Sequence, residues 1–140
     1  MHRDLKPENI MLIEEDGNIN IRMIDFGLSK IYKNQDKIHT ACGSPSYAAP
    51  EILEGKSYDG LKADIWSLGI VLFAMTCGHL PFDDKEEQRL FSKIVYSHFH
   101  LPSYLSTPLT DLLKQMLQKN PEERINIEEI KRHPWLKNID

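Results

Sequence analysis

The first 27 residues of the chain contain two short acidic motifs that limit what the chain can fold into. The opening segment, Met1 to Asn9, reads M-H-R-D-L-K-P-E-N. Its Pro7 fixes the backbone φ angle and donates no hydrogen bond, so the segment is predicted to be a shaped loop. The second motif, Asp25-Phe26-Gly27, directly follows the run Ile21 to Ile24. Taken singly, such aspartates are typical of turns and helix caps, so only the combination of the two motifs indicates a function.

Two strand-like runs, Ile10 to Ile13 and Ile19 to Ile24, lie between the motifs and predict a β-hairpin. Residues 14–18 separate the runs and read E-E-D-G-N. Asp-Gly between two apolar segments is a strong hairpin signal. A hairpin brings its two ends together, so Asn9 and Asp25 are expected to lie close to each other. Amide and carboxylate oxygens are hard ligands, and Mg²⁺ takes a few of these together with substrate phosphate.

Residues 28–47 form a polar stretch with little periodicity, and Ala49-Pro50-Glu51 closes it. A segment of this length without regular structure inside a compact domain is typically functional or disordered. It contains lysines and two hydroxyl side chains that recur below, Thr40 and Ser44.

The second half of the chain has helical patterns. Residues 62–76 carry apolar side chains on nearly all faces, which predicts a helix buried all round, and Gly78 is expected to end it. Capping residues or an N-terminal proline predict three further helix starts, at Asp84 with Glu87, at Thr107 with Pro108, and at Asn126 with Glu129.

Composition excludes several classes of protein. With 140 residues, 41% hydrophobic and 27% charged, the chain suits one soluble globular domain. A net charge of −4 and the lack of a basic block argue against nucleic acid as a partner. The two cysteines and six histidines form no zinc-binding pattern. Because Ile65 to Cys77 is too short to span a bilayer and no signal segment opens the sequence, we expect no membrane contact and an intracellular location, in the cytoplasm or the nucleus.

Taken together, the motifs resemble those of a protein kinase, and the resemblance runs from the first residues to Trp135. In that family the aspartate of an H-R-D-x-x-x-x-N loop accepts the substrate hydroxyl proton, while the asparagine of the loop and the D-F-G aspartate hold Mg²⁺. The resemblance therefore implies Asp4 as the base, and Asn9 and Asp25 as Mg²⁺ ligands.

Lys6 indicates which hydroxyl groups the implied kinase phosphorylates. Tyrosine kinases carry alanine or arginine at this position, so a lysine favours serine and threonine substrates. The resemblance implies a serine/threonine kinase whose partners are protein substrates and whose cofactors are ATP and Mg²⁺. Lys6 is implied to act in catalysis beside Asp4. Together with Asn9 and Asp25, it is also implied to bind the nucleotide.

In the kinase pattern, residues 25–51 are the activation segment. Thr40 stands where many kinases carry an activating phosphothreonine, which would make an upstream kinase a partner of the chain. A phosphate adds about −1.5 to −2 charge and attracts cationic side chains, and Arg3 and Lys30 are the expected receivers. An ordinary solvated threonine is the alternative.

Four further residues have roles implied by the resemblance. Ser44 is implied to hydrogen-bond Asp4 and Lys6. Residues 64–69, D-I-W-S-L-G, resemble the D-x-W-S-x-G of the central kinase helix, so Asp64 would cap the backbone of the Asp4 loop. Arg124 is implied to form a buried, structural ion pair with Glu51.

The expected fold is mainly α with a short β-hairpin: the large, C-terminal lobe of a protein kinase, lacking the β-rich N-lobe. The expected parts are a catalytic loop at 1–9, a hairpin at 10–24, an activation segment at 25–51 and a helical substrate platform at 52–140.

Residues 40–51, 77–84 and 132–136 look like the calmodulin-dependent kinase group, closest to its AMP-activated/sucrose-nonfermenting branch. The sequence contains no glycine-rich phosphate loop and no V-A-I-K lysine. We therefore expect a partial kinase domain that is inactive by itself. The alternatives are a non-catalytic interaction module and a truncated gene product.

Overall fold

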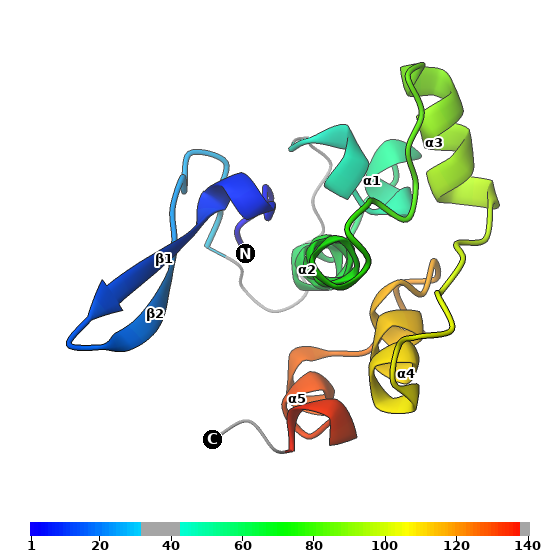
Figure 1. Cartoon of the computed structure of the whole chain (residues 1–140). Helices are drawn as coiled ribbons and strands as arrows, with labels where there is room; N and C mark the ends of the chain where they lie inside the picture. The colour runs from blue at the N-terminus through cyan, green and yellow to red at the C-terminus, as the bar shows by residue number, and fades with distance from the viewer. Residues whose placement is uncertain (32–42, 138–140) are drawn as a thin grey trace.

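The computed structural model of the chain describes residues 1–31 and 43–137 (Figure 1). A two-stranded hairpin lies on one side, and the helices gather around one central helix, α2. In chain order the elements are η1 (Pro7–Asn9), β1 (Ile10–Glu15), β2 (Asn18–Met23), η2 (Pro45–Tyr47), α1 (Pro50–Leu53), α2 (Gly60–Cys77), α3 (Glu87–Tyr96), α4 (Thr107–Met116), α5 (Ile127–Lys131) and η3 (Pro134–Leu136).

The predicted hairpin is confirmed. Strands β1 and β2 pair antiparallel, from Ile10 opposite Met23 to Glu15 opposite Asn18. The two turn residues, Asp16 and Gly17, have φ values of 55° and 78°, as a type I′ turn requires. Because this turn needs only two residues, the ladder extends through both glutamates of the predicted loop, and β1 ends later than expected.

The hairpin has apolar side chains that the described residues leave uncovered. Five of them are exposed by about half or more: Met11 at 46%, Leu12 at 69%, Ile19 at 72%, Ile21 at 68% and Met23 at 50%. The strands are therefore held by their ladder and their connections rather than by a covered apolar face.

Helix α2 is confirmed, but its predicted burial on every side is wrong. The helix starts at Gly60 because the Asp59 carboxylate accepts hydrogen bonds from two backbone N–H groups in the first turn. It ends at Gly78, whose φ of 77° is the left-handed conformation expected of a C-cap. Trp66 and Phe73 are fully buried, whereas Met75 is 76% exposed. Apolar composition alone does not show which face the neighbouring elements cover.

By length and composition α2 is also the one helix in the described ranges that could cross a membrane. The sequence predicts that the apolar run Ile65 to Cys77 is too short to span a bilayer. The helix is long enough because it begins five residues before this run and has 18 residues. Half of the apolar stretch is buried inside the structure, and the core helix of a globular domain has the same property.

The three smaller predicted helices form, with differences at their N-termini. Helix α3 begins at Glu87 without a side-chain cap, so the predicted capping box is wrong. Asp84 lies outside the helix, where it accepts from the Glu86 backbone and pairs with Lys93 at 2.9 Å. Ser106, rather than Thr107, caps α4. The capping box of α5 is confirmed in both directions, at 2.8 and 3.0 Å.

The core is built on α2. Trp66 stacks on Phe82 with ring centroids 6.2 Å apart, and Phe73 meets Phe99 edge to face. Helix α4 packs its buried face against α2 (Figure 1). A two-stranded sheet beside several helices does not by itself define one lobe of a kinase. The expected fold class, a C-lobe lacking an N-lobe, therefore does not follow from this architecture.

Candidate functional site

Asp64 of helix α2 holds the opening loop in an unusual backbone conformation. Its two carboxylate oxygens accept from the backbone N–H groups of His2 at 2.7 Å and Arg3 at 2.9 Å. Arg3 has a φ of 71°, and such conformations cost non-glycine residues about 1–3 kcal/mol. Two charge-assisted hydrogen bonds offset that cost, so the rigid core helix fixes the direction in which the next residue, Asp4, points.

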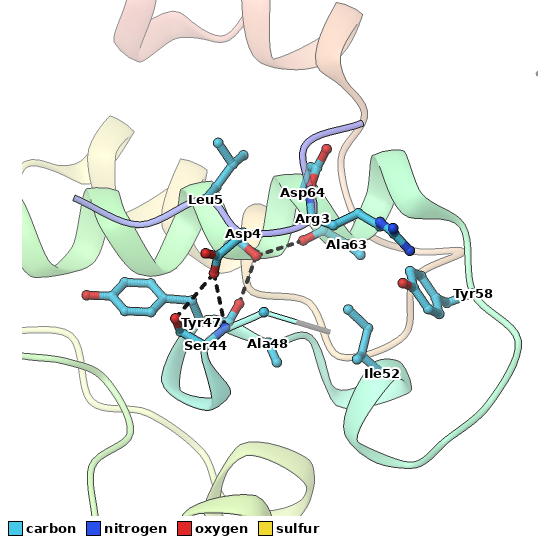
Figure 2. Close-up of a pocket in the computed structure, with 12 residues that line it drawn as sticks. Arg3, Asp4, Leu5, Ser44, Tyr47, Ala48, Ile52, Tyr58, Ala63 and Asp64 are labelled. Atoms are coloured by element: carbon cyan, nitrogen blue, oxygen red, sulfur yellow. Dashed lines mark hydrogen bonds between the residues drawn. The ribbon is translucent and has the colours of Figure 1, made fainter. Parts of the chain in front are cut away.

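The Asp4 carboxylate lies among four donor groups, and Figure 2 shows the two that Ser44 supplies. Its Oδ1 accepts from the Ser44 backbone N–H at 3.1 Å and from the Ser44 hydroxyl at 3.2 Å. Its Oδ2 lies 3.0 Å from the Lys6 ammonium and 3.2 Å from the Asn9 amide nitrogen. The Asp4 side chain is 10% exposed, so its carboxylate has one preferred orientation.

Ser44 joins Asp4 to Lys6. The Lys6 Nζ donates to the Ser44 hydroxyl oxygen at 2.8 Å, and the hydroxyl donates in turn to Asp4. These three side chains therefore form a closed cluster in which the serine comes from the far end of the 28–47 segment.

These contacts lower the pKa of Asp4. Partial burial raises the pKa, but the hydrogen bonds from Lys6 and the Ser44 backbone, together with the Lys6 charge, outweigh it. The pKa of Lys6 is raised, chiefly by its hydrogen bond to Asp4. The cluster therefore stabilises the fold fully above the ordinary carboxyl pKa of about 4. That contribution is lost as the pH falls through the lowered pKa of Asp4.

Asn9 and Asp25 lie at the base of the hairpin. The Asn9 amide nitrogen donates to the Asp4 carbonyl at 2.9 Å as well as to the Asp4 carboxylate, which leaves the amide oxygen available as a ligand. The Ile24 N–H donates to the Asn9 carbonyl at 3.0 Å. Because Asp25 is the next residue after Ile24, this hydrogen bond places the Asp25 backbone beside the loop that contains Asn9. Asp25 is exposed, with a φ of 60°.

This donor set fits Mg²⁺ but not a metal held by protein alone. Within residues 1–31 and 43–137, no three His, Cys, Asp or Glu side chains converge on one point. One amide oxygen and one exposed carboxylate match the few hard ligands that Mg²⁺ takes beside phosphate and water.

His2 links the two acidic motifs, a connection that the sequence motifs do not specify. Its Nδ1 accepts from the Asp4 N–H at 3.3 Å, so its Nε2 carries the proton and donates to the Ile24 carbonyl at 3.0 Å. Its ring packs on Phe26, with centroids 5.0 Å apart. The buried histidine thus ties the Asp4 loop to the Asp25 turn.

Thr40 lies outside the described residues, as does Cys42. The two predicted phosphate receivers lie near the start of the 28–47 segment. Arg3 donates through its Nε to the Leu28 carbonyl, and the backbones of Lys30 and Met1 exchange two hydrogen bonds of 3.3 Å. The Lys30 residue is exposed.

Glu51 and Arg124, 73 positions apart, form a bidentate ion pair, with N–O distances of 2.7 and 2.9 Å. The Arg124 side chain is fully buried and lies over the Trp66 ring at 5.2 Å. Its other N–H groups donate to three carbonyls, those of Lys62, Gln118 and Lys119. Every guanidinium donor is therefore used, and the pair ties α1 to the α4–α5 connection.

Comparison with known proteins gives the family. The model of the protein kinase domain matches residues 1–136, and the chain belongs to that family. A protein of Dictyostelium discoideum named as a probable serine/threonine-protein kinase is 48% identical over 134 residues. The match covers 96% of this chain and 16% of that protein, so the chain spans about a sixth of this relative's length.

The same comparison corrects the expected fold class. One match to the protein kinase domain covers residues 1–136, which is almost the whole chain. This match does not distinguish one lobe of the domain from the other. The expected assignment to a C-lobe that lacks the N-lobe is wrong, because motif order within a sequence does not delimit a lobe. The chain is part of the protein kinase domain family.

Proposed function

We propose that this chain is part of a protein that transfers the γ-phosphoryl group of ATP to serine or threonine hydroxyls of proteins, with Mg²⁺. The supporting observation is the Asp4 carboxylate, held in one orientation by Ser44, Lys6 and Asn9. Membership of the protein kinase family and the named relative agree with this reaction.

In the proposed reaction Asp4 orients the substrate hydroxyl and accepts its proton. The hydroxyl oxygen forms a bond to the γ-phosphorus as the bond between that phosphorus and the leaving oxygen of ADP breaks. A lowered pKa makes Asp4 a weak base that stays ionised at neutral pH. This suits a reaction whose transition state is loose and which depends mainly on positioning.

Lys6 has two proposed roles. Its ammonium keeps the Asp4 carboxylate in place, and its charge offsets negative charge on the transferring phosphoryl group. Asn9 and Asp25 would hold Mg²⁺, which neutralises charge on the phosphate oxygens when it is bound.

Replacing Asp25 with alanine tests the proposed metal site in the natural protein that contains these residues. We expect Asp25→Ala to abolish Mg²⁺-dependent ATP binding, because Asn9 alone offers one neutral ligand. Asn9→Ala should weaken binding less. Isothermal titration with MgATP measures both variants, and Asp83→Ala, which removes another exposed carboxylate, is the control. Normal MgATP binding by both site variants would show that the base of the hairpin is not the metal site.

Thr40 is the proposed activating phosphosite, with an upstream kinase as a partner. Phosphate at Thr40 would pair with Arg3 and Lys30, since arginine and lysine pair with phosphate. We expect Thr40→Ala to lower peptide phosphorylation and Thr110→Ala to leave it unchanged. The measurement is the activity of natural protein before and after phosphatase treatment. Equal activity of the two forms would refute the regulatory role.

The calmodulin-dependent kinase group, the intracellular location and the inactivity of the 140 residues alone remain predictions within this proposal. A transfer assay on residues 1–140 tests the last of them. If the natural protein binds its partners but transfers no phosphate, the non-catalytic interaction module becomes the better account.

A further inference from the structure

Gly43 occupies a position next to the Asp4 loop that no other residue fits. Its φ is 98°, in the region that favours glycine. A Cβ atom at Gly43 would lie 2.7 Å from the Arg3 carbonyl oxygen and 3.5 Å from the Asp4 Oδ1. The first distance is far inside van der Waals contact, and the atom that would have to move is backbone. Both conformation and space therefore exclude a side chain here.

This close approach is specific to Gly43 among the glycines with positive φ. Gly17, Gly55 and Gly78 have φ values of 78°, 67° and 77°, but a Cβ atom at each would meet nothing within 4 Å. Those three need glycine for their turns alone. Gly43 also needs it to lie against the backbone of the Asp4 loop.

The close approach of Gly43 brings the next residue, Ser44, within hydrogen-bonding distance of Asp4. Its N–H and hydroxyl supply the donors recorded for Asp4 Oδ1, and the same hydroxyl receives the bond from Lys6. A side chain at residue 43 would push the segment away from Arg3 and carry Ser44 with it. Asp4 would then keep only the partners of its Oδ2, namely Lys6 and Asn9.

We propose that Gly43 is a positioning residue for phosphoryl transfer: its missing side chain lets Ser44 reach Asp4 and fix the carboxylate against the substrate hydroxyl. The inference rests on the proposed function. Misplacing a reacting group by about 1 Å can cost on the order of 10²-fold in rate. The Ser44 backbone N–H donates one of the hydrogen bonds to Asp4, so loss of this bond has a consequence that NMR can detect.

The first test compares Gly43→Ala with Gly55→Ala in the natural protein. Both variants place alanine at a positive φ, but only the first creates a contact with the Asp4 loop. We expect Gly43→Ala to lower kcat on the order of 10²-fold with little change in KM for ATP. Gly55→Ala should keep kcat near the wild-type value. Equal kcat values for the two variants would overturn the proposal.

A second test reads the Ser44 backbone amide by NMR hydrogen exchange. Exchange of this amide should become faster in Gly43→Ala and stay unchanged in Gly55→Ala, because only the first change breaks its hydrogen bond to Asp4. Ser44→Ala, which removes the hydroxyl, should also lower kcat. The double variant should be little worse than either single one, because both changes act through the same hydrogen bonds. Additive losses of kcat would contradict the proposal. So would a Gly43→Ala protein that unfolds at the assay temperature while Gly55→Ala stays folded, since Gly43 would then be a requirement of the fold.

The two proposals fail in different ways. If wild-type protein transfers no phosphate, the proposed function fails, while the exchange of the Ser44 amide still shows whether Gly43 places Ser44 against Asp4. If wild-type protein is active and Gly43→Ala behaves like Gly55→Ala, only the positioning role fails.

Discussion

Asp4→Asn should lower kcat for peptide phosphorylation by about 10²–10⁴-fold, the usual contribution of a positioned acid–base group. The substitution keeps the size of the side chain but removes the carboxylate that would accept the hydroxyl proton. It also replaces the partner of the Lys6 ammonium with a neutral amide. Affinity for MgATP should change little, because Asn9 and Asp25 are the proposed metal ligands. Steady-state kinetics of the natural protein give kcat, and isothermal titration with MgATP gives the affinity.

Asp83→Asn is the matched control for this experiment. Asp83 is exposed and lies just before α3 in the chain. We expect this variant to keep wild-type kcat. If Asp4→Asn were as active as Asp83→Asn, Asp4 would be neither the base nor the group that orients the substrate.

Glu51→Ala should destabilise the fold by about 3–5 kcal/mol, as expected when one partner of a buried ion pair is removed. The Arg124 side chain has no exposed surface, so its charge would stay buried without the carboxylate. Urea unfolding of the 140-residue chain measures the change. Fluorescence is a suitable signal because Trp66 lies directly under the guanidinium.

The exposed pair Glu15–Arg22 supplies the control for this prediction. Its N–O distance is 3.1 Å, but its side chains are 53% and 62% exposed. Pairs of this kind contribute about 0–1 kcal/mol, so Glu15→Ala should change the unfolding free energy little. Equal effects of Glu15→Ala and Glu51→Ala would show that the buried pair is not a structural anchor.

The parts of the chain predicted best from sequence are those that local chemistry decides. Asp16-Gly17 specifies a two-residue turn, and Asn126 with Glu129 specifies a helix start, without help from distant residues. The ion pair of Glu51 with Arg124 is different. No local pattern joins residues 73 positions apart, and the pair was expected only from the resemblance to kinases.

The errors come from features that depend on neighbours in space. The apolar helix α2 gave no sign that Met75 would be exposed, because composition does not reveal which faces other elements cover. Aspartate is a common helix-capping residue, but the Asp84 carboxylate forms an ion pair with Lys93 and does not cap α3. Gly43 was not singled out, since its importance lies in a contact with the Arg3 carbonyl. A glycine beside Ser44 was the available signal.

Transfer of radiolabelled phosphate from γ-labelled ATP to peptides tests the proposed reaction itself. Natural protein would be incubated with matched peptides that carry serine, threonine or tyrosine, with Mg²⁺ or with a chelator, beside its Asp4→Asn variant. We expect Mg²⁺-dependent labelling of the serine and threonine peptides by the wild type, and almost none by the variant. Labelling by Asp4→Asn at the wild-type rate, or no labelling by wild-type protein phosphorylated at Thr40, would contradict the proposed function.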